Sequence, residues 1–322
     1  MKKYRAILPL SGLCIVTLVT LVTKSAQGQP FPSKPIRILT TEAGGGGDLV
    51  ARVIGHGLSS TLGQPVIIDN RGLRGGEIVA KAAGDGHTLL SYGNPLWLAP
   101  FLHAHVAFDP LKDFAPVTLS VSSPNVLVVN TSLAASSVSE LVALARGRKS
   151  ALNFASSGVG SSNHLAGELF RAMAGINLVH VPYKGAGPAL TALIGGEPQL
   201  MFPSAGSVTA HLRSGKLKGL AVTSSEPSAL APGLPTVAAS GLPGYESSLV
   251  LGVFAPSNTP VRLITQLNQE IVKVLRAPDV KDKLFSTGVE VVAGSPSQFA
   301  TRVQSEMKRL GKLIRDAGIR TD

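Results

Sequence analysis

The chain has 322 residues, with 30 Lys and Arg, 19 Asp and Glu, and a single cysteine. Its basic residues are scattered, with no long run of Lys or Arg and no interleaved aromatic residues, a pattern that argues against nucleic-acid binding. One cysteine cannot form an intramolecular disulfide, so packing alone must stabilise the fold, and the length is sufficient for two domains.

The N-terminus has the pattern of a cleavable secretory signal peptide over residues 1–28. Three basic residues, Lys2, Lys3 and Arg5, precede an apolar stretch at 6–22, and small residues follow at 26 and 28. Because the stretch is about 17 residues long, near the lower limit for crossing a bilayer, an uncleaved anchor is the alternative. Cleavage removes Cys14 and four basic residues with the signal peptide. The mature chain then has 26 Lys and Arg and 19 Asp and Glu. We therefore expect a periplasmic protein whose mild positive charge either helps to gather anions or serves solubility alone.

Short apolar runs alternate with helical patterns along the rest of the chain. We expect strands at 36–40, 65–69, 88–92, 125–130, 152–155, 178–181, 199–202, 217–222 and 249–255. We expect helices at 48–62, 138–146, 162–173, 188–194, 261–276, 280–286 and 296–317. This alternation predicts an α/β fold with parallel sheets and crossover helices.

The order of these elements predicts two α/β lobes. The first comprises residues 29–127 and 250–322, and the second comprises residues 128–249. A ligand cleft is expected between the lobes, where strand ends and helix N-termini converge.

The stretch TTEAGGGGDLVARVI places a glycine run between the first strand and the first helix. Glycines allow a ligand to approach the main chain, and the free N–H groups and dipole at a helix N-terminus favour an anion. The candidate residues of this glycine loop are Thr41, Glu42, Ala43, Gly44, Gly45, Gly46, Gly47 and Asp48. Asp48 has the alternative role of capping the helix. No Lys-Ser or Lys-Thr follows and G-x-G-x-x-G does not fit, so the loop is not a nucleotide-binding motif.

A second strand-to-helix junction, NFASSGVGSSNHLAGELF, is rich in serine. Hydroxyls and exposed amides are suited to hold a carboxylate by several hydrogen bonds. The candidates of this serine loop are Ser156, Ser157, Gly160, Ser161, Ser162 and His164. Helix capping by a serine would explain Ser161 or Ser162 but not all four serines.

Two further junctions supply weaker candidates. In VHVPYKGAGPAL, Tyr183, Lys184 and Gly185 offer donors, although Lys184 is equally well explained as a solvated surface charge. Asn94 and Trp97 are expected in the loop after the third strand, where Trp97 would supply a stacking surface.

No reaction centre is evident in the sequence. The chain has no G-x-S-x-G, no H-E-x-x-H, no clustered acidic or cysteine ligands and no paired carboxylates at a recognisable spacing. We therefore expect no enzyme activity, no metal and no cofactor. An exported serine hydrolase that uses Ser157 or Ser162 with His164 is the alternative, although Ser162 and His164 are only two residues apart and would point in different directions on one helix.

The order and spacing of many short motifs resemble a known family. They are FPSKPIRIL, GGGGDLVAR, LGQPVIIDNR, GDGHTLL, FDPLKDFAPV, the serine loop, VHVPYKGAGPAL, SGKLKGLAVTS, LPTVAASGLPGYE, FAPSNTP and KLIRDAGIR. Together they resemble the extracytoplasmic substrate-binding receptors of tripartite tricarboxylate transporters, the Bug family. The resemblance implies a monomeric type II periplasmic-binding-protein fold whose two lobes close on a small organic acid and present it to membrane permease subunits. It also implies that the ligand carboxylate is held by residues 43–48 and 156–164, partly through water.

The chain departs from the pattern of that family at several positions. Thr41 replaces a phenylalanine, Gly47 replaces a threonine, and Pro203-Ser204 stands where relatives have Asp-Asn, which brings Ser204 among the candidates. Glu42 adds an acid beside the expected anion site. It either faces solvent, which we favour because a carboxylate beside a ligand carboxylate is unfavourable, or selects a ligand with a donor or positive group. A further alternative is that the protein is an orphan receptor that delivers its ligand to a sensor or signalling partner and not to a transporter.

Overall fold

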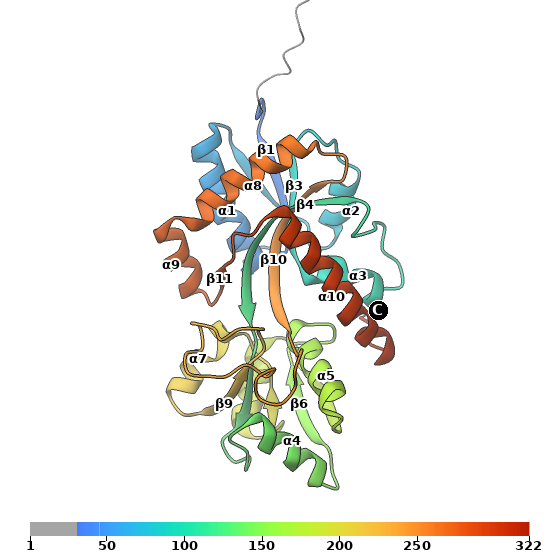
Figure 1. Cartoon of the computed structure of the whole chain (residues 1–322), viewed down its shortest axis with the longest axis vertical. Helices are drawn as coiled ribbons and strands as arrows, with labels where there is room; N and C mark the ends of the chain where they lie inside the picture. Colours follow the sequence, from blue (N-terminus) through green and yellow to red (C-terminus); the bar gives the residue numbers. More distant parts are fainter. Residues whose placement is uncertain (1–30, 45, 322) are drawn as a thin grey trace, which may run out of the picture. The chain divides into compact units, whose positions relative to one another are not determined.

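The computed structural model describes residues 31–44 and 46–321 (Figure 1). The predicted signal peptide and Gly45 lie outside the described residues. The described elements form two β-sheets with helices packed on them, so the predicted α/β class is confirmed.

The first sheet has the strand order β11-β4-β10-β3-β1-β2. Its strands are β1 (Ile36–Thr40), β2 (Val66–Asn70), β3 (Thr88–Gly93), β4 (Phe114–Pro124), β10 (Ser248–Pro256) and β11 (Glu290–Val291). β1 pairs in parallel with β2 and β3, whereas β10 runs antiparallel to β3 and β4. The prediction of a parallel sheet is therefore right for β1, β2 and β3. It is wrong for the sheet as a whole, which is mixed because β10 is antiparallel to its neighbours. A strand that is buried on both faces is apolar throughout, so its composition does not reveal its direction.

The helices that follow these strands are α1 (Gly46–Leu62), α2 (Arg74–Ala80), α3 (Asn94–Leu102), α8 (Val261–Arg276), α9 (Pro278–Ser286) and α10 (Pro296–Asp316). α1 packs against α8, and α10 packs against α3 and β4. α10 begins with a capping box, because Ser295 Oγ accepts from Gln298 N and Gln298 Oε1 accepts from Ser295 N.

The second sheet has the strand order β7-β6-β8-β5-β9. Its strands are β5 (Val126–Asn130), β6 (Leu152–Ser156), β7 (Leu178–Pro182), β8 (Leu200–Met201) and β9 (Leu217–Val222). Its helices are α4 (Val138–Gly147), α5 (Ser162–Ala174), α6 (Ala186–Gly195) and α7 (Ala205–Arg213). β6 is parallel to β7 and β8, but β5 is antiparallel to β8 and β9, so this sheet is also mixed.

Two segments connect the sheets. β4 leads into β5 through the fully buried Asn125, and the chain returns between β9 and β10. At the crossing, Asn125 N donates to Thr223 Oγ1 (2.8 Å) and Thr223 N donates to Asn125 O (2.9 Å). The two connecting segments are therefore hydrogen-bonded side by side, in agreement with the paths of β4 and β10 in Figure 1.

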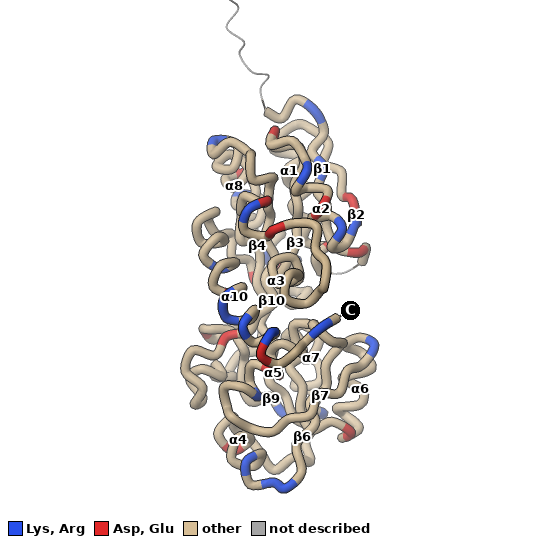
Figure 2. Tube along the Cα trace, turned by 90° about the vertical axis from the view of Figure 1, so that its right-hand side faces the viewer, with Lys and Arg blue, Asp and Glu red and all other residues tan. Residues whose placement is uncertain are grey.

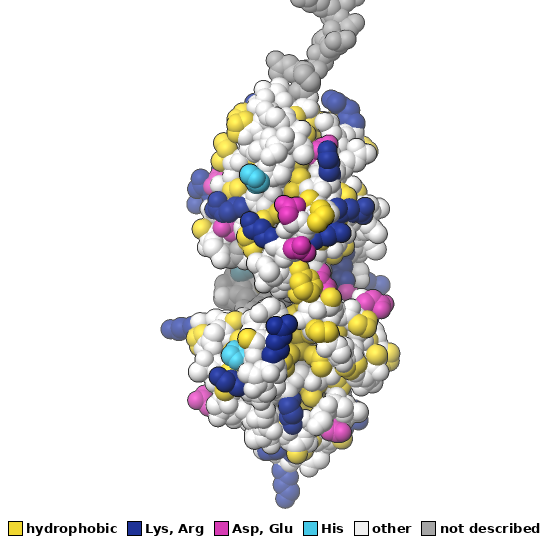
Figure 3. Space-filling model, turned by 90° about the vertical axis from the view of Figure 1, so that its left-hand side faces the viewer, with side chains coloured by type: hydrophobic (Ala, Val, Ile, Leu, Met, Phe, Trp, Pro, Cys, Tyr) yellow, Lys and Arg dark blue, Asp and Glu magenta, His cyan; other side chains and the backbone are white. Residues whose placement is uncertain are grey.

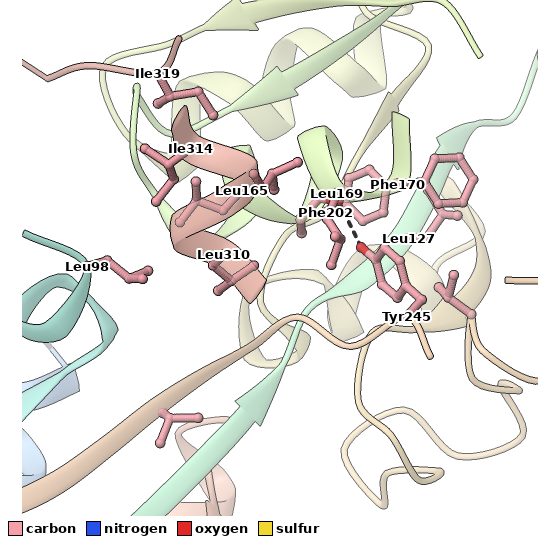
Figure 4. Packing of buried hydrophobic residues seen from close by; sticks show 14 of the residues in the cluster. Leu98, Leu127, Leu165, Leu169, Phe170, Phe202, Tyr245, Leu310, Ile314 and Ile319 are labelled. Atoms are coloured by element: carbon pink, nitrogen blue, oxygen red, sulfur yellow. Dashed lines mark hydrogen bonds between the residues drawn. The ribbon is translucent and has the colours of Figure 1, made fainter. Parts of the chain in front are cut away.

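One hydrophobic cluster extends through elements of both sheets. Figure 4 shows Leu98 of α3, Leu165 of α5, and Leu310 and Ile314 of α10 within it. Full burial of a side chain of this size is worth about 2 kcal/mol, so the contact of α10 with α5 joins the two parts of the fold strongly.

Several elements have no counterpart in the sequence prediction, namely α2, α3, α7, β4 and β11. α3 (NPLWLAPFL) is apolar on every side and contains Pro100, so it has no helical periodicity to detect. The one local signal was Pro95 in its first turn, a position that proline favours. Within the part of the chain that the structure describes, no helix is long and apolar enough to cross a membrane.

The charged residues are distributed as the sequence predicted. Figure 2 shows Lys and Arg spread along elements of both sheets. On the face in Figure 3, basic side chains are interspersed with acidic and hydrophobic ones.

Candidate functional site

The glycine loop connects β1 to α1, and its geometry is controlled by Asp48. α1 begins at Gly46, two residues before the predicted start, so Asp48 lies in the first turn. Its buried carboxylate accepts hydrogen bonds from Arg52 Nε (3.0 Å), Asn70 Nδ2 (2.8 Å) and Gly44 N (3.0 Å). These bonds, led by that of Arg52, lower the pKa of Asp48 to about 2 against the opposing effect of burial. The Gly44 amide is therefore engaged by the protein itself and is not free to bind a ligand.

Two of the departures from the family pattern lie against each other. A Cβ atom on Gly47 would lie 2.6 Å from Thr41 Oγ1. The small residue at 47 therefore makes room for the Thr41 side chain. Thr41 Oγ1 is buried and has no hydrogen-bond partner in the described residues.

Glu42 is exposed and lies over the turn that follows β2. Its carboxylate occupies the space that a Cβ atom on Gly72 would need, and Gly72 has φ +55°. Burial, with a further contribution from the charge of Glu42, raises the pKa of Tyr92 to about 12. Glu42 thus extends toward the carboxyl ends of β2 and β3, and whether it faces a ligand stays a prediction.

The hydroxyls of the serine loop are largely bonded within the loop. Ser157 Oγ donates to Asn163 Oδ1 (3.1 Å), and Ser161 Oγ is 2.6 Å from Gly158 O. Ser161 is also the N-cap of α5, where its Oγ accepts from His164 N. Ser162 differs, because its hydroxyl has no hydrogen-bond partner among the described residues and it lines a cavity. Of the four predicted hydroxyl donors, Ser162 is thus the one that remains available.

The buried Ser156 ends β6 beneath this loop. Its Oγ is 2.6 Å from His180 Nε2 and accepts from Gly158 N (3.2 Å). His164 is also buried, with its Nδ1 accepting from Gly160 N (3.0 Å). His164 therefore supports the loop, and its predicted contact with a ligand stays a prediction.

The hydrolase alternative lacks the required geometry. Within residues 31–44 and 46–321, no hydrogen bond joins His164 to Ser162 or to the Ser157 hydroxyl. A serine–histidine bond does join Ser156 and His180, but the Ser156 side chain is inaccessible to a substrate.

A cavity of about 100 Å³ lies at the start of α5, between elements of the two sheets. Leu98, Leu165 and Leu310 line it from three helices, as Figure 4 illustrates. The other lining residues are Asn94, Pro95, Leu102, Gly160, Ser161, Ser162, Ser247, Ser248 and Leu249. The structure thus brings the predicted Asn94 to the serine loop, whereas no described residue of the glycine loop lines this cavity.

Asn94 and Trp97 lie in α3 and not in a loop as predicted. Trp97 is fully buried against Phe254 and Phe299, with its Nε1 donating to Glu306 Oε2 (3.0 Å). It is a core residue, and the prediction that it stacks on a ligand is wrong. Asn94 lines the cavity, but its amide is used for structural hydrogen bonds.

Sequence patterns did not predict the buried charge network on α10. Glu306 is 1% exposed and accepts from Arg302 Nε (2.6 Å), Asn94 Nδ2 (2.5 Å) and Trp97 Nε1. Arg302 also pairs with Glu246 in the segment that leads into β10. Burial raises the pKa of Glu306, and the neighbouring Arg302 opposes this shift. The i,i+4 spacing of Arg302 and Glu306 was visible in the sequence, but their burial was not.

The remaining candidates lie around the serine loop. Gly185 N donates to Ser157 O (3.1 Å), so the β7–α6 turn braces the loop. Tyr183 Oη donates to Glu197 (3.4 Å), and Lys184 is exposed. Ser204 precedes α7, with its Oγ bonded to Ser207 Oγ (3.1 Å). In the described residues, no three His, Cys, Asp or Glu side chains are grouped to hold a metal.

The chain has the two-lobe fold of periplasmic binding proteins. The structure of a TctC solute-binding protein from Polaromonas matches this chain with a TM-score of 0.81, over 89% of this chain and 99% of that chain. The two sequences are only 24% identical, so this match shows the fold and not the function. The model for the tripartite tricarboxylate transporter family receptor matches residues 50–319. The chain therefore belongs to this family of periplasmic solute-binding receptors, as its motifs predicted.

Similar proteins cover nearly the whole chain. BugT of Bordetella pertussis is 34% identical over 319 residues, 97% of each protein. A UPF0065 protein from a Pseudomonas species is 37% identical over 311 residues, 95% of this chain and 92% of its own. A structure of an R. palustris protein with adipate is 34% identical, with a TM-score of 0.72 over 90% of this chain and 99% of that one. MatC from Rhodopseudomonas palustris with bound malate is 32% identical, with a TM-score of 0.70 over 88% of this chain and 100% of that one.

Proposed function

We propose that this receptor binds a small organic acid between its lobes and delivers it to the membrane permease subunits of a tripartite tricarboxylate transporter. The observation that carries the proposal is the start of α5 at the cavity. There the free N–H groups and positive dipole end of a 13-residue helix adjoin the available Ser162 hydroxyl. This combination favours a carboxylate over a neutral group.

The walls of the cavity bear on the rest of the ligand. Five leucines and Pro95 form the apolar part of the cavity, which favours a short aliphatic body next to the charged end. Relatives solved with adipate and with malate support a small organic acid as the ligand. We propose that the glycine loop provides a second anion site, with the amides of Gly46 and Gly47 in place of the engaged Gly44.

The chain organisation is proposed as the sequence predicts it. Residues 1–28 are a cleaved signal peptide, residues 29–127 with 250–322 form one lobe, and residues 128–249 form the other. The mature receptor acts as a monomer. Mass spectrometry of the exported protein tests the cleavage site and the oligomeric state together.

Thermal unfolding with a panel of acids tests the binding function. A ligand at about 100 times its Kd adds about 2.7 kcal/mol, which corresponds to a rise in Tm of roughly 4–5 °C for a protein of this size. Adipate and malate are the first acids to assay, and adipamide, which lacks the charge, is the matched control. If no organic acid at millimolar concentration raises Tm, the proposal is wrong.

A substitution at Ser162 tests the location of the site. Ser162→Ala should weaken binding of the acid about tenfold, because it removes one hydrogen bond to a charged group. Ser139→Ala on the exposed face of α4 is the control and should leave the affinity unchanged. Equal affinities for the two variants would place the ligand elsewhere.

A further inference from the structure

We infer that the stacked imidazoles of His164 and His180 position the serine loop for ligand binding, and that protonation of His164 releases the loop. The inference rests on the proposed function for its effect on ligand affinity. Its structural part stands on contacts within the chain.

The two histidines hold the loop at both of its ends. His180 on β7 bonds through Nε2 to Ser156 Oγ (2.6 Å), which in turn accepts from Gly158 N (3.2 Å). His164 on α5 accepts from Gly160 N at Nδ1 (3.0 Å). Two of the loop amides therefore point inward to these supports, and this arrangement sets the direction of the peptide groups between them.

The stacking makes the two supports a single unit. The imidazole centroids are 3.8 Å apart with an interplanar angle of 16°, and Phe154 of β6 stacks on His180 with a centroid distance of 4.9 Å. Gly167, one turn along α5 from His164, has no room for a side chain because a Cβ atom would meet the Phe154 ring. The imidazoles are consequently held between β6, β7 and α5 with little freedom to rotate.

The hydrogen bond from Gly160 defines the protonation state of His164. A nitrogen that accepts a hydrogen bond carries no proton, so His164 is neutral with its proton on Nε2. A proton added at Nδ1 would place two N–H donors opposite each other and break the bond. A second positive charge on His180, 3.8 Å away, would be strongly disfavoured.

Burial, more than the surrounding charges, favours the neutral form of both histidines. Burial lowers the pKa of His164 to about 4, and Arg171 on α5 adds to this effect. Burial also lowers the pKa of His180 to about 4, with His164 adding to the shift and Glu168 opposing it. Glu168 Oε1 lies 3.9 Å from His164 Nε2, but its other oxygen is occupied by Arg171. The loop is therefore braced at pH 7 and loses its brace near pH 4.

Two substitutions at His164 distinguish the effect of its hydrogen-bond acceptor from the effect of the size of its ring. His164→Asn keeps an acceptor oxygen at the position of Nδ1 and does not titrate, whereas His164→Leu removes the acceptor. At pH 7, His164→Leu should weaken adipate binding about tenfold, and His164→Asn should change it less than about threefold. Equal losses in the two variants would overturn the positioning role.

The pH dependence of ligand affinity distinguishes this role of His164 from a purely structural one, because only a titrating imidazole makes the affinity of the wild type change with pH relative to that of His164→Asn. Protonation of adipate affects every variant alike, so the ratio of the wild-type Kd to that of His164→Asn isolates the imidazole. This ratio should rise about twofold between pH 7 and pH 4, where about half of His164 is protonated and unable to hold the loop. A constant ratio would overturn the acid-release part of the inference.

Amide hydrogen exchange tests the brace without any ligand. The Gly160 amide should be protected in the wild type and in His164→Asn and should exchange rapidly in His164→Leu. His180→Gln should keep the Gly158 amide protected, and His180→Leu should lower its protection less than His164→Leu lowers that of Gly160, because Gly158 N donates to Ser156 Oγ, which stays in place. If adipate does not bind but these patterns hold, the binding proposal fails while the brace stands; if protection is identical in all variants, the brace is wrong.

Discussion

Neutralising Glu306 should cost more stability than neutralising any exposed acid on the same helix, because it removes one partner of the buried Arg302 guanidinium. Its carboxylate receives hydrogen bonds from Arg302, Asn94 and Trp97 in an environment where it is 1% exposed. In Glu306→Gln, the amide oxygen can still accept from Asn94 and Trp97, but its NH₂ group faces the Arg302 guanidinium. Breaking a buried pair by neutralising one partner costs about 3–5 kcal/mol. Because Arg302 keeps Glu246 as a second partner, we expect a loss of about 2–3 kcal/mol, just below that range.

Urea unfolding followed by circular dichroism measures this loss, and α10 provides its own control. Asp316 pairs with Lys312 at the same i,i+4 spacing, but both side chains are more than half exposed. Asp316→Asn should therefore cost less than about 0.5 kcal/mol. If both substitutions lower the free energy of unfolding by the same small amount, the buried network does not act as described. A change confined to the slope of the unfolding curve would likewise contradict the expected loss of native stability.

Three further outcomes follow from the structure. The neutral His164, with a folded pKa of about 4, makes the free energy of unfolding fall as pH decreases from about 6.5 to 4, because the unfolded chain takes up the proton first. The part due to His164 is at most about 3 kcal/mol, and pH-dependent unfolding of His164→Asn should lack this part while it keeps the fall due to His180. The Asp48 carboxylate, with a folded pKa of about 2, stabilises the protein above pH 4 and loses this effect as pH falls toward 2, so Asp48→Asn should cost about 1–2 kcal/mol at pH 7 and almost nothing at pH 2. Gly288 has φ +84°, and a Cβ atom there would meet the Gly206 backbone, so Gly288→Ala should cost more than about 2 kcal/mol in the same assay. Gly318 has φ +63° but open space around it, so Gly318→Ala should cost only about 1 kcal/mol. Equal costs would contradict the close contact at Gly288.

The two loops show how far local patterns predict a site. A glycine run and a serine run each stand between a strand and a helix, and the structure has both at those junctions. The residues that engage these loops come from elsewhere in the chain. Asn70 reaches the glycine loop from β2, and His180 reaches the serine loop from β7. Spacing along the chain does not reveal such contacts, so amides and hydroxyls already bonded within the protein were predicted as ligand donors.

The sequence by itself determined the family, the α/β class and the positions of most helices and strands. Apolar periodicity and end signals such as Ser295 and Gln298 are local, because they depend on which side of a short segment meets water. The tertiary structure alone decided the direction of β10, the burial of Trp97 and Glu306, and the choice of Ser162 as the available hydroxyl. These features depend on which distant segments share one core, since a polar group is free or engaged only with respect to the neighbours that folding brings to it.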